Sequence, residues 1–284
     1  AALLVALAVP ACSASPTDAP PDGGGASAGL PEDIRSSGRL AIGSELTTPP
    51  LTYRGEDGKT ILGLNHDLAQ ALGERLGVEV VFEQYAFAGL IPAVQSGKAD
   101  MAMDIINDTA ERQRVVDFVD YLENGTTMLL RKGNPDGIRV LADLCGRSAA
   151  LVRGSVQIPL VQEQSDRCVA EGRPPVELMQ FAAPPEARLQ VQHGRVSAFF
   201  GNTPVMIYLA ENAEGGTVFE AATSEQYLPQ PVGMIFAKGD TQLRDAVLAA
   251  LQQLFDDGTY AALLEKYHLT DLALEKPTVN GASR

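Results

Sequence analysis

The chain has 284 residues, of which 45% are hydrophobic and 20% charged, so it can bury a substantial core and is neither disordered nor held by disulfides alone. Its formal charge of −14 argues against general affinity for nucleic acid or anionic lipid, which both require a clustered cationic surface. We therefore expect a globular protein without a nucleic-acid partner.

The N-terminal segment has the composition of an export signal followed by a tether. Residues 1–11 are apolar but fall short of the about 20 residues that a membrane-spanning helix needs. The sequence Val9-Pro10-Ala11-Cys12 resembles a bacterial lipobox, and residues 13–29 are rich in Ser, Ala, Pro and Gly. We expect residues 1–37 to comprise a signal remnant, a lipobox and a flexible tether, with Cys12 lipidated and anchored to the cell membrane.

The two remaining cysteines, Cys145 and Cys168, form an even pair. In an oxidising compartment they can close a disulfide loop, whereas in the cytosol both would be free thiols. A metal pair would need further ligands, and the three histidines, at positions 66, 193 and 268, lie at no metal-site spacing. Since the N-terminal segment indicates export, we predict the disulfide, and neither a metal nor a cofactor.

Strand and helix patterns alternate along the body of the chain and predict two α/β units. The first unit has strands over 40–43, 78–83 and 100–106 with helices over 65–76 and 89–95. After a Gly/Pro/Asp break at 133–137, the second has strands over 148–152, 176–179 and 196–200 with helices over 155–165 and 185–193. A strand over 232–237 and two helices follow, the last over 259–267.

Two such units enclose a cleft at the carboxyl ends of their strands, which suits a small anionic or zwitterionic ligand. The first unit's last strand leads into a turn with Asn107, Thr109 and Arg112, the residue types that grip a carboxylate. An arginine taken alone is more often a surface salt-bridge residue. The motifs H-E-x-x-H and C-x-x-C do not occur.

Nine short motifs, in order, resemble the extracellular solute-binding proteins of ABC importers, in the polar amino-acid-binding family (family 3). Among them are Pro49-Pro50-Leu51-Thr52-Tyr53, Gly63-Leu64-Asn65-His66-Asp67, Thr109-Ala110-Glu111-Arg112 and Gly194-Arg195-Val196-Ser197-Ala198. The resemblance implies a two-lobed α/β clamshell, in which each lobe is a mostly parallel sheet flanked by helices. Lobe 1 would comprise residues 38–126 and 231–272, lobe 2 residues 127–230, and a polar tail residues 273–284.

The resemblance also implies a ligand site. Arg112 would pair with the ligand carboxylate, assisted by Thr109 and by the chain at Ile105 and Asn107. Gly154 and Ser155 would contribute from the opposite lobe, Phe87 would stack on the ligand, and Glu45 would touch the ligand side chain. Without the resemblance, an aromatic residue such as Phe87 or Tyr53 is more often part of the core.

Two positions depart from the family pattern. Asn202 stands where the family has an aspartate that neutralises the ligand ammonium, and a buried unpaired ammonium is costly. Asp104 stands where the family usually has a small residue. We therefore expect a ligand whose cationic or hydrogen-bonding group lies toward Glu45 and Asp104, such as a basic or modified amino acid. Alternatively, Asp104 caps the turn at Asn107-Asp108-Thr109.

The function implied by the resemblance is capture of a small solute outside the cell and its delivery to an ABC permease. The lipobox and the cysteine pair further resemble the actinobacterial lipoproteins of this family, and we expect a monomer with hinges at 124–129 and 227–233. Two alternatives remain open. One is an enzyme on the same fold, dehydratase-like or glycan-cleaving, with Glu45 and Asp104 as acid or base candidates, and the other is an extracellular sensor.

Overall fold

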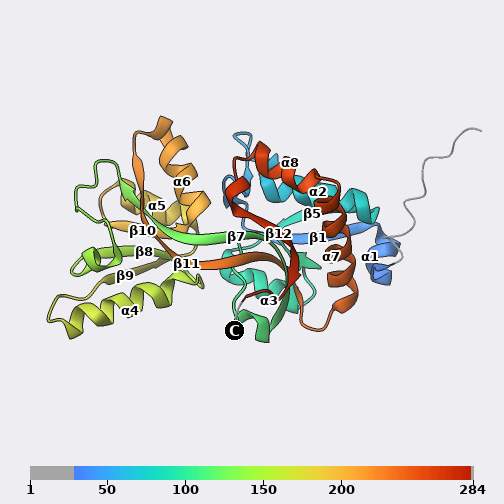
Figure 1. Cartoon of the computed structure of the whole chain (residues 1–284), viewed down its shortest axis with the longest axis horizontal. Helices are drawn as coiled ribbons and strands as arrows, with labels where there is room; N and C mark the ends of the chain where they lie inside the picture. Colours follow the sequence, from blue (N-terminus) through green and yellow to red (C-terminus); the bar gives the residue numbers. More distant parts are fainter. Residues whose placement is uncertain (1–28, 283–284) are drawn as a thin grey trace, which may run out of the picture.

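Two α/β bodies, lobe 1 and lobe 2, lie at opposite ends of the molecule and are connected by two long strands in this computed structural model (Figure 1). The structure describes residues 29–282. The predicted signal remnant, Cys12 and nearly all of the tether lie outside these residues. Across residues 29–282, every helix is too short or too polar to span a membrane.

Lobe 1 is built on parallel strands. β1 (Arg39–Ser44) pairs in parallel with β5 (Glu79–Gln84) and β6 (Met101–Ala102). The helices are α1 (Glu32–Ser37), α2 (Leu64–Leu76), α3 (Leu90–Gln95), α7 (Thr241–Asp256) and α8 (Thr259–Lys266). The two helices near the C-terminus therefore pack on lobe 1, where α7 contacts α2 through apolar faces.

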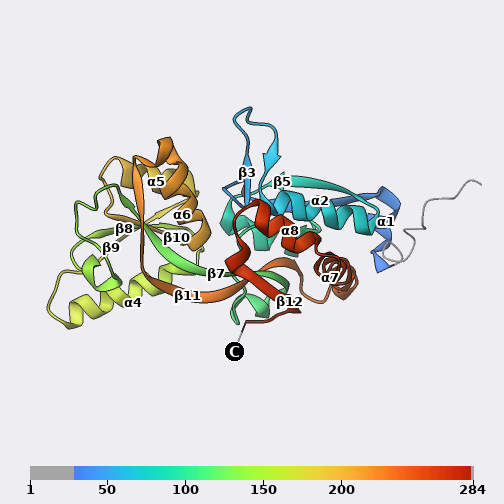
Figure 2. The ribbon, with the colours of Figure 1, turned by 45° about the horizontal axis from the view of Figure 1, so that its top comes forward.

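A small antiparallel sheet rises from lobe 1 beside the main sheet (Figure 2). It consists of β2 (Thr47–Thr48), β3 (Thr52–Arg54) and β4 (Ile61–Leu62). The Asp57 side chain accepts hydrogen bonds from the backbone N–H groups of Lys59 and Thr60, and thereby closes the turn between β3 and β4.

Lobe 2 has the same plan. β8 (Ser148–Val152) pairs in parallel with β9 (Glu177–Phe181) and β10 (Ala198–Asn202). Its helices are α4 (Gln157–Ala170), α5 (Pro184–Gln192) and α6 (Thr203–Asn212). The sequence pattern did not predict α6, although its second residue, Pro204, is a common helix-start signal.

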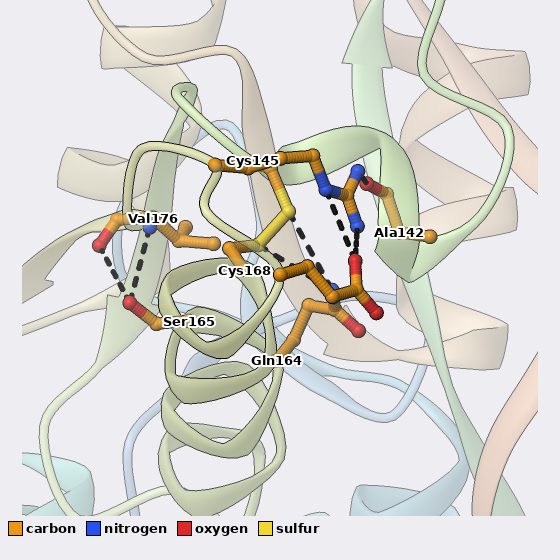
Figure 3. Close-up of a disulfide and its surroundings, with 8 residues drawn as sticks. Ala142, Cys145, Gln164, Ser165, Cys168 and Val176 are labelled. Atoms are coloured by element: carbon orange, nitrogen blue, oxygen red, sulfur yellow. Dashed lines mark hydrogen bonds and ion pairs between the residues drawn. A yellow bond between two sulfur atoms is a disulfide. The ribbon is translucent and has the colours of Figure 1, made fainter.

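The predicted disulfide is confirmed. Cys145, directly before β8, is bonded to Cys168 on α4, with their Cα atoms 5.5 Å apart (Figure 3). Beside the bridge, Ser165 accepts a hydrogen bond from the Val176 N–H over 3.0 Å. The disulfide attaches α4 to the chain before β8, and this hydrogen bond attaches α4 to the chain before β9.

The connection between the lobes is an antiparallel pair of strands, β7 (Val116–Arg131) and β11 (Phe219–Ala237), which runs through both bodies (Figure 1). The expected hinge segments, 124–129 and 227–233, lie inside these strands and coincide with register shifts of the pair. The resulting strand order is β5-β1-β6-β11-β7-β10-β8-β9.

The structure differs from the sequence interpretation at both ends of the described chain. Leu30 and Ile34, in the expected tether region, are buried against lobe 1 through α1. The expected polar tail instead contains β12 (Ala273–Val279), which pairs with β7. Polar side chains on an edge strand conceal it from pattern reading, because the backbone supplies the pairing.

Candidate functional site

A cleft lies between the two lobes. Both lobes contribute to its lining. From lobe 1 come Glu45, Thr48, Phe87, Ile105, Asn107 and Arg112, and from lobe 2 come Val152, Ser155, Val156, Gln157, Pro184, Phe199, Phe200, Gly201, Asn202, Val205 and Met206. Most of these side chains are apolar, so the few polar groups among them set the orientation of a ligand.

Arg112 is the cation of the cleft and also connects the lobes. Its Nη1 donates to the Asn107 carbonyl over 2.8 Å and its Nη2 to the Gly154 carbonyl over 3.1 Å. The Thr109 hydroxyl accepts from the Arg112 backbone N–H, and the guanidinium carbon lies 5.5 Å from the centre of the Phe87 ring. Burial lowers the pKa of Arg112 to about 10, so the group stays charged at neutral pH.

Glu45 is the carboxyl group of the cleft lining. Its side chain is buried at 3% exposure, and Oε1 has no hydrogen-bond partner. Burial first, and then the nearby charge of Asp104, raise the pKa of Glu45 to about 8. Glu45 therefore holds its proton at neutral pH until a cationic group lies beside it.

Asp104 does not line the cleft. It is fully buried and accepts hydrogen bonds from the Ser44 hydroxyl, the Glu45 N–H and the Thr48 hydroxyl at 2.8, 2.8 and 3.1 Å. Its bonds thus hold the loop that carries Glu45 and do not cap the turn at Asn107, and Asp104 itself lies outside the cleft lining. The sequence could not reveal this role of Asp104, because the groups that donate to it are backbone N–H groups and hydroxyl groups of a kind found in many loops.

The lobe 2 side of the cleft offers hydrogen-bonding groups and no charge. Ser155 Oγ and, from lobe 1, Asn107 Nδ2 are buried without a partner. Asn202 Oδ1 already accepts from Asn124 Nδ2 over 2.5 Å, which ties the cleft to strand β7. Asn202 therefore does not supply the charge that an aspartate would bring to this position.

The structure collects most of the predicted site residues in one place. Glu45, Phe87, Ile105, Asn107, Arg112, Ser155 and Asn202 line the cleft, while Thr109 and Gly154 act on Arg112 from outside it. Sequence reasoning missed Thr48, Gln157 and the apolar wall formed by Phe199, Val205 and Met206. The wall had no sequence signal of its own, because apolar residues on a strand and the next helix look like core.

A metal site is not formed by the residues that the structure describes: within 29–282, no three His, Cys, Asp or Glu side chains are grouped to hold an ion. The polar groups of the cleft lining can form hydrogen bonds and charge pairs with a ligand.

Comparisons with known proteins agree with this geometry. The family model of bacterial extracellular solute-binding proteins, family 3, matches residues 40–270. The arginine-binding protein ArgT of Corynebacterium glutamicum is 28% identical over 88% of this chain and 81% of its own length. The L-cystine-binding protein TcyJ of Escherichia coli is 27% identical over 86% of this chain and 88% of its own.

Among solved structures, an ancestral arginine-binding protein bound to arginine is 32% identical over 81% of this chain and 98% of its own, with a TM-score of 0.72. The fold, the cleft between the lobes and the sequence therefore all indicate the same family over most of the chain. This chain belongs to the bacterial extracellular solute-binding proteins of family 3.

Proposed function

We propose that this protein captures a basic amino acid, or an amino-acid derivative with a cationic group, outside the cell and delivers it to an ABC permease. One observation supports this class of ligand. The cleft presents one cationic side chain, Arg112, and one carboxyl group with an unpartnered oxygen, Glu45. A ligand with a carboxylate and a cationic group complements both.

The carboxylate end of the ligand has three donors available. The Arg112 guanidinium supplies the charge, and the unpartnered Asn107 Nδ2 and Ser155 Oγ supply hydrogen bonds from opposite lobes. A buried donor without a partner is costly, so a carboxylate that accepts from these groups gains more than it would on an exposed surface. Binding across the gap also holds the lobes together.

The cationic end of the ligand is assigned to Glu45. The neutral Asn202, already bonded to Asn124, supplies no ion pair for an ammonium group. The arginine-binding relatives support a basic ligand, since arginine carries a cationic group on its side chain. Glu45 takes the charge that this group brings into the cleft.

We further propose that the protein catalyses no reaction, acts as a monomer and is anchored to the membrane through lipidated Cys12. Catalysis by a carboxyl pair would require two acids in the cleft, and Asp104 is committed to its loop while Glu45 alone lines the cleft. Replacement of Cys12 by serine should release the protein from the membrane fraction, which fractionation of expressing cells checks.

Titration calorimetry of the mature protein tests the ligand class. We expect L-arginine or another basic amino acid to bind most tightly, and Arg112→Ala to weaken that binding by about 100-fold, because it removes the partner of a buried carboxylate. Arg114→Ala is the matched control, since Arg114 lies in the same turn but is exposed, and its Kd should stay within about twofold.

Two results would contradict the proposal. Equally tight binding of glycine, alanine and leucine would show that the cleft does not select a ligand with an additional cationic group. An Arg112→Ala variant with unchanged affinity would show that the carboxylate is held elsewhere.

A further inference from the structure

A strap formed by residues 273–282 crosses lobe 1 on the edge of the connecting strands. Its strand β12 pairs antiparallel with β7, with Thr278 opposite Asp120 and Val279 opposite Val119. The family match ends at residue 270, so the strap lies outside the part of the chain that the family model describes.

The strap supplies hydrogen-bond donors to acidic side chains beneath it. Asn280 Nδ2 donates to Asp117, while the Gly281 N–H and the Thr278 hydroxyl both donate to Asp120 Oδ2, at 2.8 and 3.0 Å. The Ala282 N–H donates to Asp108 Oδ2 over 3.0 Å. The Asn280 side chain also accepts from the Phe118 N–H over 2.8 Å, which fixes the strap on β7.

One of these carboxylates belongs to the turn that carries the ligand site. Asp108 follows Asn107 directly, is fully buried, and accepts two further hydrogen bonds from Gln113 Nε2 at 2.8 and 2.9 Å. Gln113 in turn follows Arg112. The Asp108 carboxylate therefore joins the residue after Asn107 to the residue after Arg112. The strap contacts the same carboxylate through the Ala282 N–H.

A second carboxylate connects the strap to the hinge. Asp120 is fully buried, and Gly233 of β11 lies so close that a Cβ built on it would be 2.7 Å from Asp120 Oδ1. The Gly233 N–H donates to the Ile106 carbonyl, directly before the same turn. Burial and the charge of Asp108 raise the pKa of Asp120 to about 6, and the hydrogen bonds that Asp120 accepts from Gly281 and Thr278 offset part of this rise.

We propose that the strap is a positioning element of the binding site, which holds Asp108 and Asp120 so that the turn from Asn107 to Gln113 presents its groups to the ligand. This inference rests on the proposed binding function. The Ala282 N–H is the point of contact with the turn, and the strap acts through Asp108 without touching the ligand.

A pair of variants at Ala282 isolates this contact in the full chain. Ala282→Pro removes the N–H that donates to Asp108, whereas Ala282→Ser keeps it. Calorimetry with L-arginine as the probe should show a roughly tenfold weaker Kd for Ala282→Pro and a change within about twofold for Ala282→Ser. Hydrogen exchange should accelerate over residues 106–113 in Ala282→Pro alone, which a general loss of stability would not confine to this turn.

A second variant covers the case in which Ala282→Pro does not fold. Thr278→Val removes the hydroxyl that donates to Asp120 at nearly constant shape, and it should weaken L-arginine binding by about threefold. Lys276→Ala, on an exposed position of the same strand, is its control and should leave the Kd unchanged.

The outcomes separate the two proposals. Variants that bind L-arginine as the wild type does, including variants that only melt at a lower temperature, would overturn the role of the strap while the binding function stands. A wild-type protein that binds neither L-arginine nor any other basic amino acid would overturn the proposed function, and this inference with it.

Discussion

Glu45 should couple ligand binding to proton release. Its pKa of about 8 lies above the ordinary range because burial and Asp104 disfavour the charged form, so the free protein carries a protonated Glu45 at pH 7. A cationic ligand group favours the carboxylate and lowers this pKa. Binding therefore expels a proton, and affinity should increase by about tenfold per pH unit up to about pH 8.

Calorimetry of L-arginine binding at pH 7, in two buffers of different ionisation enthalpy, checks this expectation. The wild type should release close to one proton, whereas Glu45→Gln should release none and bind the ligand about tenfold or more weakly. A wild-type affinity that does not vary from pH 6 to pH 8 would contradict the assignment of the ligand cation to Glu45.

The same two acids show what sequence reasoning can resolve at the scale of one residue. Glu45 and Asp104 looked equivalent as carriers of negative charge, but Asp104 is enclosed by the Ser44–Thr48 loop and Glu45 faces the cleft. The difference depends on which backbone N–H groups converge on each carboxylate after folding. The place of Arg112 in the cleft followed from the turn after a strand end only together with the family resemblance, since an arginine in such a turn is by itself more often a surface residue.

At the scale of the elements, the disulfide stabilises lobe 2 by joining α4 to the segment before β8. Cys145 lies in the segment before β8 and Cys168 near the end of α4, so the bridge closes a loop of 23 residues around the first helix of the lobe. We expect the double variant Cys145→Ser/Cys168→Ser to lose about 3 kcal/mol of unfolding free energy, because the unfolded chain gains the freedom of that loop.

Chemical denaturation of the wild type and the double variant measures this loss. Because neither cysteine lines the cleft, the L-arginine affinity of the folded double variant should stay within about twofold of the wild type. A large loss of affinity with little loss of stability would contradict this separation of lobe 2 stability from the binding site.

Elements with a regular apolar pattern were predictable, and elements formed by backbone pairing were not. The helix patterns over 65–76 and 259–267 correspond to α2 and α8 within a residue or so. β12 was missed because Glu275 and Lys276 point to solvent on an edge strand. α6 was missed because its apolar residues follow β10 directly and continue the pattern of a buried strand.

At the scale of the molecule, the two lobes share one sheet through β7 and β11, and residues of both lobes line the cleft. The repeat of α/β units predicted two lobes, but it did not show that the connections are continuous strands. Their pairing, with its register shifts around Tyr227 and Gln230, depends on contacts between residues far apart in sequence. The Arg112–Gly154 hydrogen bond spans the same gap.

If the ligand spans this gap, a substitution at Ser155 should weaken ligand binding without lowering the stability of the free protein. Its buried hydroxyl has no partner in the free protein, so Ser155→Ala removes an unsatisfied polar group and should leave the melting temperature of the free protein unchanged or slightly higher. The same change removes a lobe 2 donor to the ligand carboxylate, and should weaken L-arginine binding by about tenfold.

Thermal denaturation with and without L-arginine measures both effects on one sample, because the ligand-induced rise in melting temperature reports affinity. Thr203→Ala is a matched control: its hydroxyl pairs with Thr127 outside the cleft lining, so it should lower stability and leave affinity intact. If Ser155→Ala instead lowered the stability of the free protein and left the ligand-induced rise unchanged, the ligand would be held by lobe 1 alone. Closure would then not depend on a carboxylate shared between the lobes.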